Sequence, residues 1–130
     1  MALADQAYLA HEAYYNATGQ YRAFSEGGTA SDVWAYEWVV YRDGRTWAVL
    51  YSDGSVLGMS PVIYTKVAVG FLSLYDTSFA KGMTVYLEQT LPDPTNGYCE
   101  GVDEDGAQIE GLGIHTNGLI VGAARYAILN

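Results

Sequence analysis

The sequence predicts a mainly α-helical fold with one small β-hairpin. Apolar residues recur every three or four positions near both ends of the chain, which is the spacing of an amphipathic helix. Residues 61–75 are almost continuously apolar, and a second helical segment follows them directly. Asp43-Gly44 separates two segments of high β propensity, which is a hairpin signal. With 130 residues and half of them hydrophobic, the chain is expected to form one domain with its own core.

The first predicted element is a helix over residues 2–16. Its apolar positions lie three and four residues apart, and Gly19 is a suitable residue for the C-terminal cap. Residues 20–25 are expected to be extended, and Gly27-Gly28-Thr29 to form a loop.

The predicted β-hairpin comes next. Residues 33–41 are rich in Val, Trp and Tyr and suit a strand, although a short helix is an alternative. Residues 42–45 would form the turn, and residues 46–51 the returning strand. Ser52-Asp53-Gly54 is the next predicted turn.

Two helices joined by a very short connection are predicted after the hairpin. Ser60 is suited to the N-cap and Pro61 to the first turn of a helix that runs to about Tyr75. This helix is apolar almost all round and should be buried on most sides. Asp76-Thr77-Ser78 ends it and caps a second helix to about Thr90, so that the two form an αα-hairpin.

Pro92 and Pro94 stop the second helix, and an acidic, glycine-rich loop is expected up to about Gly113. A last helix is predicted over residues 115–129. The apolar central helix needs neighbours on several sides, which favours an oligomer or a place in a larger helical array.

Charge and composition exclude several classes of partner. Fifteen acidic and six basic residues give a net charge of −9, which disfavours nucleic acid and anionic membrane surfaces. No segment is long and apolar enough for membrane insertion, and no signal peptide is visible. The single cysteine, Cys99, excludes an internal disulfide. We expect no metal and no cofactor, because two partial calcium-type segments, at 93–97 and 103–106, do not fit the EF-hand pattern.

Five ordered segments of the chain resemble the C-terminal third of an uncharacterised prokaryotic domain family from cell-envelope and polysaccharide-related proteins. They are Thr18–Glu26, Tyr36 with Asp43–Leu50, Ser60–Thr77, Gly97–Gly106 with its spacing of Gly97, Tyr98, Gly101, Glu104 and Gly106, and Thr116–Ile120. The resemblance implies an (α/α)-toroid of the kind found in many glycoside hydrolases. It also implies an extracytoplasmic or envelope setting. The family domain is much longer than this chain, which has His115 and Asp103 where the family more often has Asn and Tyr.

Carboxylates on glycine-flanked loops are the main candidates for chemistry. Glycoside hydrolysis usually needs two of them, and their separation sets the stereochemistry. The candidate acids are Glu26, Glu37, Glu100, Asp103, Glu104 and Asp105. Glu26 and Glu104 are the predicted catalytic pair, because both lie inside the family-like segments. The alternative for each acid is a solvated position on an acidic loop.

Other side chains are predicted to bind the substrate. Aromatic rings pack well on the apolar faces of sugars, and the predicted binding aromatics are Tyr36, Trp47 and Tyr98, with Trp34 and Trp38 as further candidates. The alternative is that these rings pack on the helices. Lys66 is expected either to contact substrate or to pair with Glu26 or Glu104. Asp103 lies in the acidic loop, and Asn117 either binds a sugar hydroxyl or caps the last helix.

The sequence therefore predicts a carbohydrate-active or carbohydrate-binding module, with an oligo- or polysaccharide as its partner. The alternative is a self-assembling structural protein without catalysis. A toroid of six helical hairpins has twelve helices and this chain has about four, so the predicted oligomer is a homotrimer, or another closed ring, that rebuilds a toroid-like body.

Overall fold

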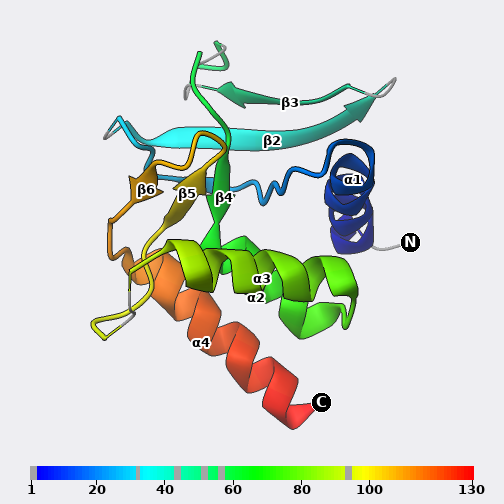
Figure 1. Cartoon of the computed structure of the whole chain (residues 1–130), viewed down its shortest axis with the longest axis vertical. Helices are drawn as coiled ribbons and strands as arrows, with labels where there is room; N and C mark the ends of the chain where they lie inside the picture. The colour runs from blue at the N-terminus through cyan, green and yellow to red at the C-terminus, as the bar shows by residue number, and fades with distance from the viewer. Residues whose placement is uncertain (1–2, 32, 43–44, 51–52, 56–57, 93–94) are drawn as a thin grey trace.

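A computed structural model describes residues 3–31, 33–42, 45–50, 53–55, 58–92 and 95–130, with the backbone alone for 37–42 and 45–50. It contains four helices and two small antiparallel sheets (Figure 1). The helices are α1 (Leu3–Thr18), α2 (Thr65–Leu74), α3 (Ser78–Thr90) and α4 (Ile114–Leu129). The prediction of a mainly helical fold with a β-hairpin is confirmed in this coarse form.

The first sheet contains the predicted hairpin. Its strands run antiparallel in the order β1 (Glu26–Gly27), β2 (Ala35–Arg42) and β3 (Arg45–Leu50). The strand predicted at 33–41 is confirmed, and the helical alternative is wrong. The turn residues Asp43 and Gly44 and the turn residue Ser52 lie outside the described residues. This sheet lies across one end of the molecule, above the helices in Figure 1.

The second sheet corrects two predictions. Its antiparallel strands are β4 (Val62–Tyr64), β5 (Gly101–Asp103) and β6 (Gln108–Ile109). The helix predicted to begin at Pro61 begins instead at Thr65, because Val62, Ile63 and Tyr64 pair with β5. The segment predicted as an acidic loop also folds, since β5 and β6 form a hairpin within it.

Close backbone contact between β4 and β5 depends on Gly101. A Cβ atom at this position would overlap the carbonyl oxygen of Ile63 on the neighbouring strand. The acids and glycines of this segment lack the apolar alternation that marks a strand in a sequence, so their pairing is set by long-range contact.

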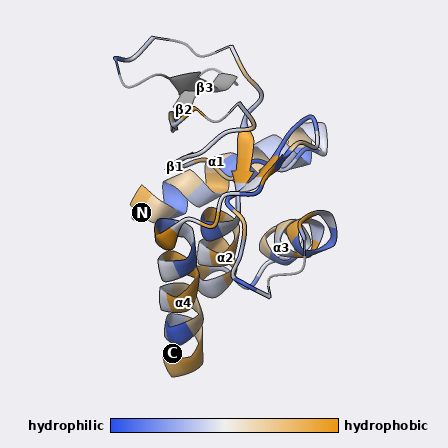
Figure 2. Cartoon of the chain, turned by 90° about the vertical axis from the view of Figure 1, so that its left-hand side faces the viewer, coloured by the Kyte–Doolittle hydropathy of each residue, from blue (hydrophilic) through white to orange (hydrophobic). Residues whose placement is uncertain are grey.

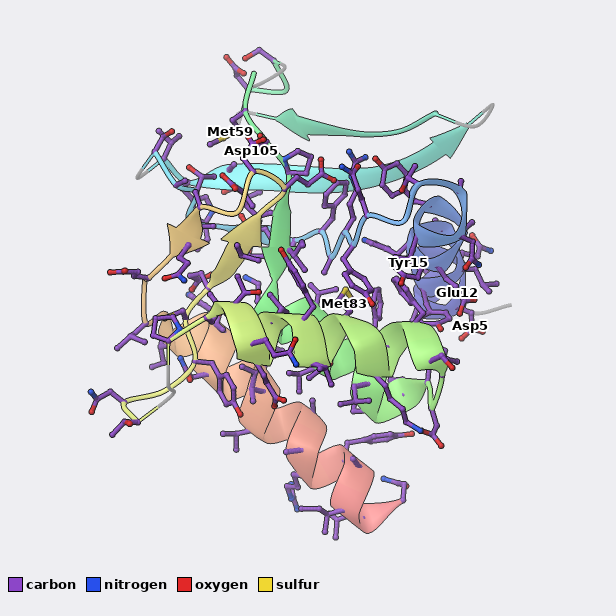
Figure 3. The ribbon with its side chains drawn as sticks, viewed as in Figure 1. Asp5, Glu12, Tyr15, Met59, Met83 and Asp105 are labelled. Carbon is purple, nitrogen blue, oxygen red and sulfur yellow. The ribbon has the colours of Figure 1, made fainter. Side chains whose placement is uncertain are left out.

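The α2–α3 hairpin has the predicted short connection and the predicted end at Thr90, although α2 begins later than predicted. Thr77 is the N-cap of α3, and its hydroxyl accepts a hydrogen bond from the backbone N–H of Ala80 at 3.2 Å. Helix α2 packs against both α3 and α4, which explains its apolar character. Met83, labelled in Figure 3, points from α3 into the core and is fully buried.

A cluster of aromatic rings docks α1 onto this hairpin. Tyr8 stacks on Tyr75 with ring centroids 4.0 Å apart, and Tyr15 stacks on Tyr21 at 4.4 Å. Tyr8 also makes an edge contact with Phe71 of α2. Edge-to-face and offset pairs of this kind stabilise a core beyond the area they bury. Figure 3 shows Tyr15 on α1, on the side that faces the hairpin.

Helix α4 is the least covered element. It packs on α2 through the buried residues Thr116 and Ile120 and runs out from the body of the molecule (Figures 1 and 2). Most of its other apolar side chains are exposed, among them Ile114 at 83% and Ile128 at 82%. Within the described part of the chain, no helix has the length and apolar character needed to cross a membrane.

Candidate functional site

Glu100 is a buried carboxylate without a hydrogen-bond partner on one of its oxygens. Glu100 immediately precedes β5 and is 5% exposed. Within the described residues its Oε2 atom has no hydrogen-bond partner. The backbone around it is fixed, because its N–H donates to the carbonyls of Ile109 and Gly111 and its carbonyl accepts from Thr65 N. An unpaired buried carboxylate oxygen is costly and calls for an explanation.

Three glycines make the space for this carboxylate. A Cβ at Gly113 would overlap Glu100 Oε1, and one at Gly27 would lie 3.0 Å from Oε2. A Cβ at Gly111 would lie 3.4 Å from the Cγ of the same side chain. The glycines that flank the two acidic loops in the sequence thus converge on Glu100.

Glu100 borders an open groove of about 630 Å³, which we call the Glu100 groove. Trp34 lies on its wall with 47% of its surface exposed, and Glu110 is an exposed second acid on the same groove. The other lining residues are mostly glycine and polar positions of the two flanking segments: Gly28, Thr29, Ala30, Val33, Gln108, Ile109, Gly111, Leu112 and Gly113.

Lys66 and Tyr64 hold the β1 side of this groove in place. The Lys66 ammonium, also only 5% exposed, donates to the backbone carbonyl of Glu26 at 2.5 Å and lies 5.2 Å from the centre of the Tyr64 ring. The Tyr64 hydroxyl donates to the Gly28 carbonyl at 3.1 Å. Lys66 therefore anchors β1 through the backbone carbonyl of Glu26, whereas the sequence predicted a contact with substrate or with the carboxylate of Glu26 or Glu104.

The predicted pair Glu26 and Glu104 occupies two different environments. The Glu104 carboxylate forms a two-point ion pair with Arg22, with the second bond, from Nη2 to Oε2, at 3.0 Å. It borders a cavity of about 280 Å³ to which Glu26 does not contribute. Glu26 lies exposed on β1, opposite Tyr36 of β2.

The side chains of Asp103 and Asn117 form hydrogen bonds with backbone groups of nearby loops. Asp103 Oδ1 accepts hydrogen bonds from the N–H groups of Asp105 at 3.0 Å and Ala107 at 2.8 Å, which shapes the turn of the β5–β6 hairpin. Asn117 lies in the first turns of α4 but does not cap it. Its side chain accepts from Tyr98 N at 2.8 Å and donates to Tyr98 O at 3.0 Å, so it clamps the preceding loop.

Of the predicted binding aromatics, Tyr36 and Tyr98 have described side chains, and neither lines the Glu100 groove; the side chain of the further candidate Trp38 lies outside the described part. Tyr98 borders a separate cavity between α2 and α3, and Tyr36 lies half-buried on β2. Trp47 lies on β3, and its side chain falls outside the described part of the structure. Trp34, one of the further candidates that the sequence offers for sugar stacking, does line the groove.

Neither metal nor thiolate chemistry is indicated by the described residues. They contain no group of three His, Cys, Asp or Glu side chains placed to hold a metal ion. Burial, together with the nearby charge of Glu110, raises the pKa of the Cys99 thiol. A raised pKa disfavours the reactive thiolate.

The groove can therefore offer hydrogen-bond acceptors and one aromatic face to a polar ligand. Glu100 differs from its acidic neighbours because its carboxylate lies against Gly27 and Gly113, which are distant from it or from each other in the sequence.

No curated protein and no solved structure matches the chain. A family model described as "Protein of unknown function (DUF3131)" matches residues 1–130. Since this match covers the whole sequence, the chain belongs to that family.

Proposed function

We propose that the Glu100 groove binds a carbohydrate. The observation that carries the proposal is the buried carboxylate of Glu100, whose Oε2 atom has no partner among the described residues, on the same groove as the exposed ring of Trp34. Sugar hydroxyls donate to carboxylates, and the apolar face of a sugar ring packs on indole.

The groove's size and charge narrow the ligand class. Its volume of about 630 Å³ falls within the range of small-molecule sites in proteins. Glu100 and Glu110 both border it, and the chain carries a net charge of −9. Like charges repel, so neutral sugars or amino sugars are favoured over uronic acids. Oligosaccharides cut from envelope or extracellular polysaccharides are the proposed ligands.

If the protein is an enzyme, we propose that it hydrolyses the carbohydrate bound in the Glu100 groove. Hydrolysis would require a second carboxylate, and Glu110 is the other acid on the groove. Glu104 is engaged by Arg22, so Glu100 with Glu110 replaces Glu26 with Glu104 as the pair to test first.

Calorimetric titration with a panel of neutral, amino and acidic oligosaccharides tests the binding proposal. We expect the wild type and the control Glu88→Gln, which lies outside the Glu100 groove, to bind equally. Trp34→Ala and Glu100→Gln should each weaken binding at least about tenfold, which corresponds to one lost charged hydrogen bond or stacking contact. Equal binding by all four proteins would refute the proposal.

A second function, self-assembly, is supported by the exposed apolar surface of α4. Leu119, Val121 and Leu129 are 57%, 68% and 65% exposed, and α4 carries no carboxylate in this acidic chain. A second copy can therefore approach α4 without like-charge repulsion from it. We propose that α4 mediates a homotrimer that completes a toroid-like ring of helices.

Light scattering on the wild type and on Val121→Glu tests the assembly. We expect the wild type to be a trimer and Val121→Glu to dissociate to a smaller mass. Lys81→Glu serves as a charge-change control on α3 and should leave the mass unchanged. A monomeric wild type at working concentration would refute the assembly proposal.

A further inference from the structure

A second cavity, distinct from the Glu100 groove, lies between α2 and α3. Its volume is about 220 Å³. Val69 of α2, Leu87 of α3 and the following residues Leu91 and Pro92 give it mostly apolar walls. No residue of the Glu100 groove lines it.

The size of this cavity suits one aromatic ring with a short side chain. An apolar cavity of about 150 Å³ in another protein holds benzene and stays free of water. The larger volume here leaves room for two or three more heavy atoms. Apolar walls make a dry, hydrocarbon-like ligand the favourable occupant.

One wall of the cavity is held rigidly. Tyr98 closes it from the loop before β5, and Asn117 fixes the backbone of Tyr98 through both its N–H and its carbonyl. Thr65 also borders the cavity, and its buried hydroxyl has no hydrogen-bond partner among the described residues. The cavity is thus a preformed feature, with an unexplained polar atom beside it.

The charge at the cavity is negative. Glu88 of α3 borders it and is exposed, and no described cation forms an ion pair with this carboxylate. The net charge of −9 adds to the attraction of a positive ligand. An apolar body with an ammonium group matches both the walls and the rim.

We propose that this cavity binds small aromatic amines. The ring would lie among Val69, Leu87 and Leu91, and the ammonium group would lie at the Glu88 carboxylate. The proposal does not depend on carbohydrate binding, because the two sites share no residue.

Three probes of nearly equal shape test the charge preference by calorimetry and NMR titration: 2-phenylethylamine, 2-phenylethanol and phenylacetate. We expect the amine to bind about fivefold more tightly than the alcohol, as an exposed ion pair allows, and phenylacetate more weakly than either. Glu88→Gln should remove the preference for the amine and leave binding of the alcohol unchanged. Glu110→Gln, which removes an equal charge from the other groove, should preserve the preference.

Filling the cavity tests the location. Val69→Phe should abolish binding of the amine and the alcohol, and Thr84→Leu, at another wall, should do the same. The melting temperature and NMR spectrum establish whether each variant is folded. If Val69→Phe is not folded, Thr84→Leu decides the outcome. Absence of binding by the wild type at millimolar amine, equal binding of amine and phenylacetate, or wild-type binding by a folded, cavity-filled variant would each overturn the proposal.

Discussion

The guanidinium group of Arg22 contacts both the Glu104 carboxylate and the ring of Tyr14. It forms a two-point ion pair with the carboxylate and lies 3.9 Å from the ring centre. The two side chains are only 12% and 15% exposed. Glu104 directly follows β5, and Arg22 lies in the segment that follows α1. The ion pair therefore joins the segment after α1 to the second sheet.

Breaking this ion pair should destabilise the fold. Glu104→Gln would leave a largely buried guanidinium without its counter-charge, and we expect a loss of about 3 kcal/mol in the free energy of unfolding. Chemical denaturation measures the loss. The exposed pair of Lys81 with Asp76 provides the matched control, and Asp76→Asn should cost under about 1 kcal/mol. Equal effects of the two substitutions would contradict the structural role given to Glu104.

His11 should make the protein less stable in mild acid. Burial, with a further contribution from Arg22, lowers the pKa of His11 from 6.5 to about 4 in the folded state, against the opposing effect of the Ala7 carbonyl. The unfolded chain therefore binds the extra proton first as the pH falls from about 6.5 to about 4. Stability should fall across that window, by about 3 kcal/mol in total.

Denaturation at several pH values measures this contribution. The His11 ring is neutral, with Nε2 accepting from Phe24 N at 3.1 Å and Nδ1 2.7 Å from the Ala7 carbonyl. His11→Gln should flatten the pH dependence in this window, whereas His115→Gln, at an exposed position, should not. An unchanged slope in His11→Gln would show that other groups cause the acid sensitivity.

Asn117 should stabilise the loop before β5. Asn117→Ala removes both hydrogen bonds to the backbone of Tyr98 and should cost about 2 kcal/mol. Asn130 makes a comparable side-chain bond to the Tyr126 carbonyl, but at an exposed position. Asn130→Ala should therefore change stability by less than about 0.5 kcal/mol, as determined by thermal unfolding.

Gly113 should be essential to the position of Glu100. The Cβ of Gly113→Ala would overlap Glu100 Oε1, and we expect a loss of about 1–3 kcal/mol together with weaker ligand binding at the groove. Gly118→Ala on α4 meets no atom within 4 Å and should raise stability by up to about 1 kcal/mol. Unfolding curves for both variants make the comparison, and a neutral Gly113→Ala would contradict the packing described around Glu100.

Local sequence signals predicted the helices well and the second sheet poorly. The capping Thr77 and the apolar run after Thr65 act within a few residues, so they identified α2 and α3. The pairing of Val62 with Asp103 spans some forty positions of chain, and no local pattern marks it. Pro61 suits a helix start and a strand edge equally, so it does not mark the residue at which α2 begins.

The same limit applied to the site. The family-like segments favour Glu104 as a catalytic acid, but its ion-pair partner Arg22 lies far away in the sequence. Glu100 is four residues from Glu104 and chemically identical, so composition could not separate their roles. Burial and the converging glycines distinguish them, and both follow from the tertiary fold.

Carbohydrate binding at the Glu100 groove is tested most directly by NMR. Amide and indole signals of the isotope-labelled protein would be followed during titration with the oligosaccharide panel. We expect shifts that saturate and concentrate at Trp34, Gly28 and residues 108–113, and that need at least about tenfold more ligand to saturate in Glu100→Gln. No saturable shift with any oligosaccharide, or shifts confined to other parts of the chain, would contradict carbohydrate binding at this groove.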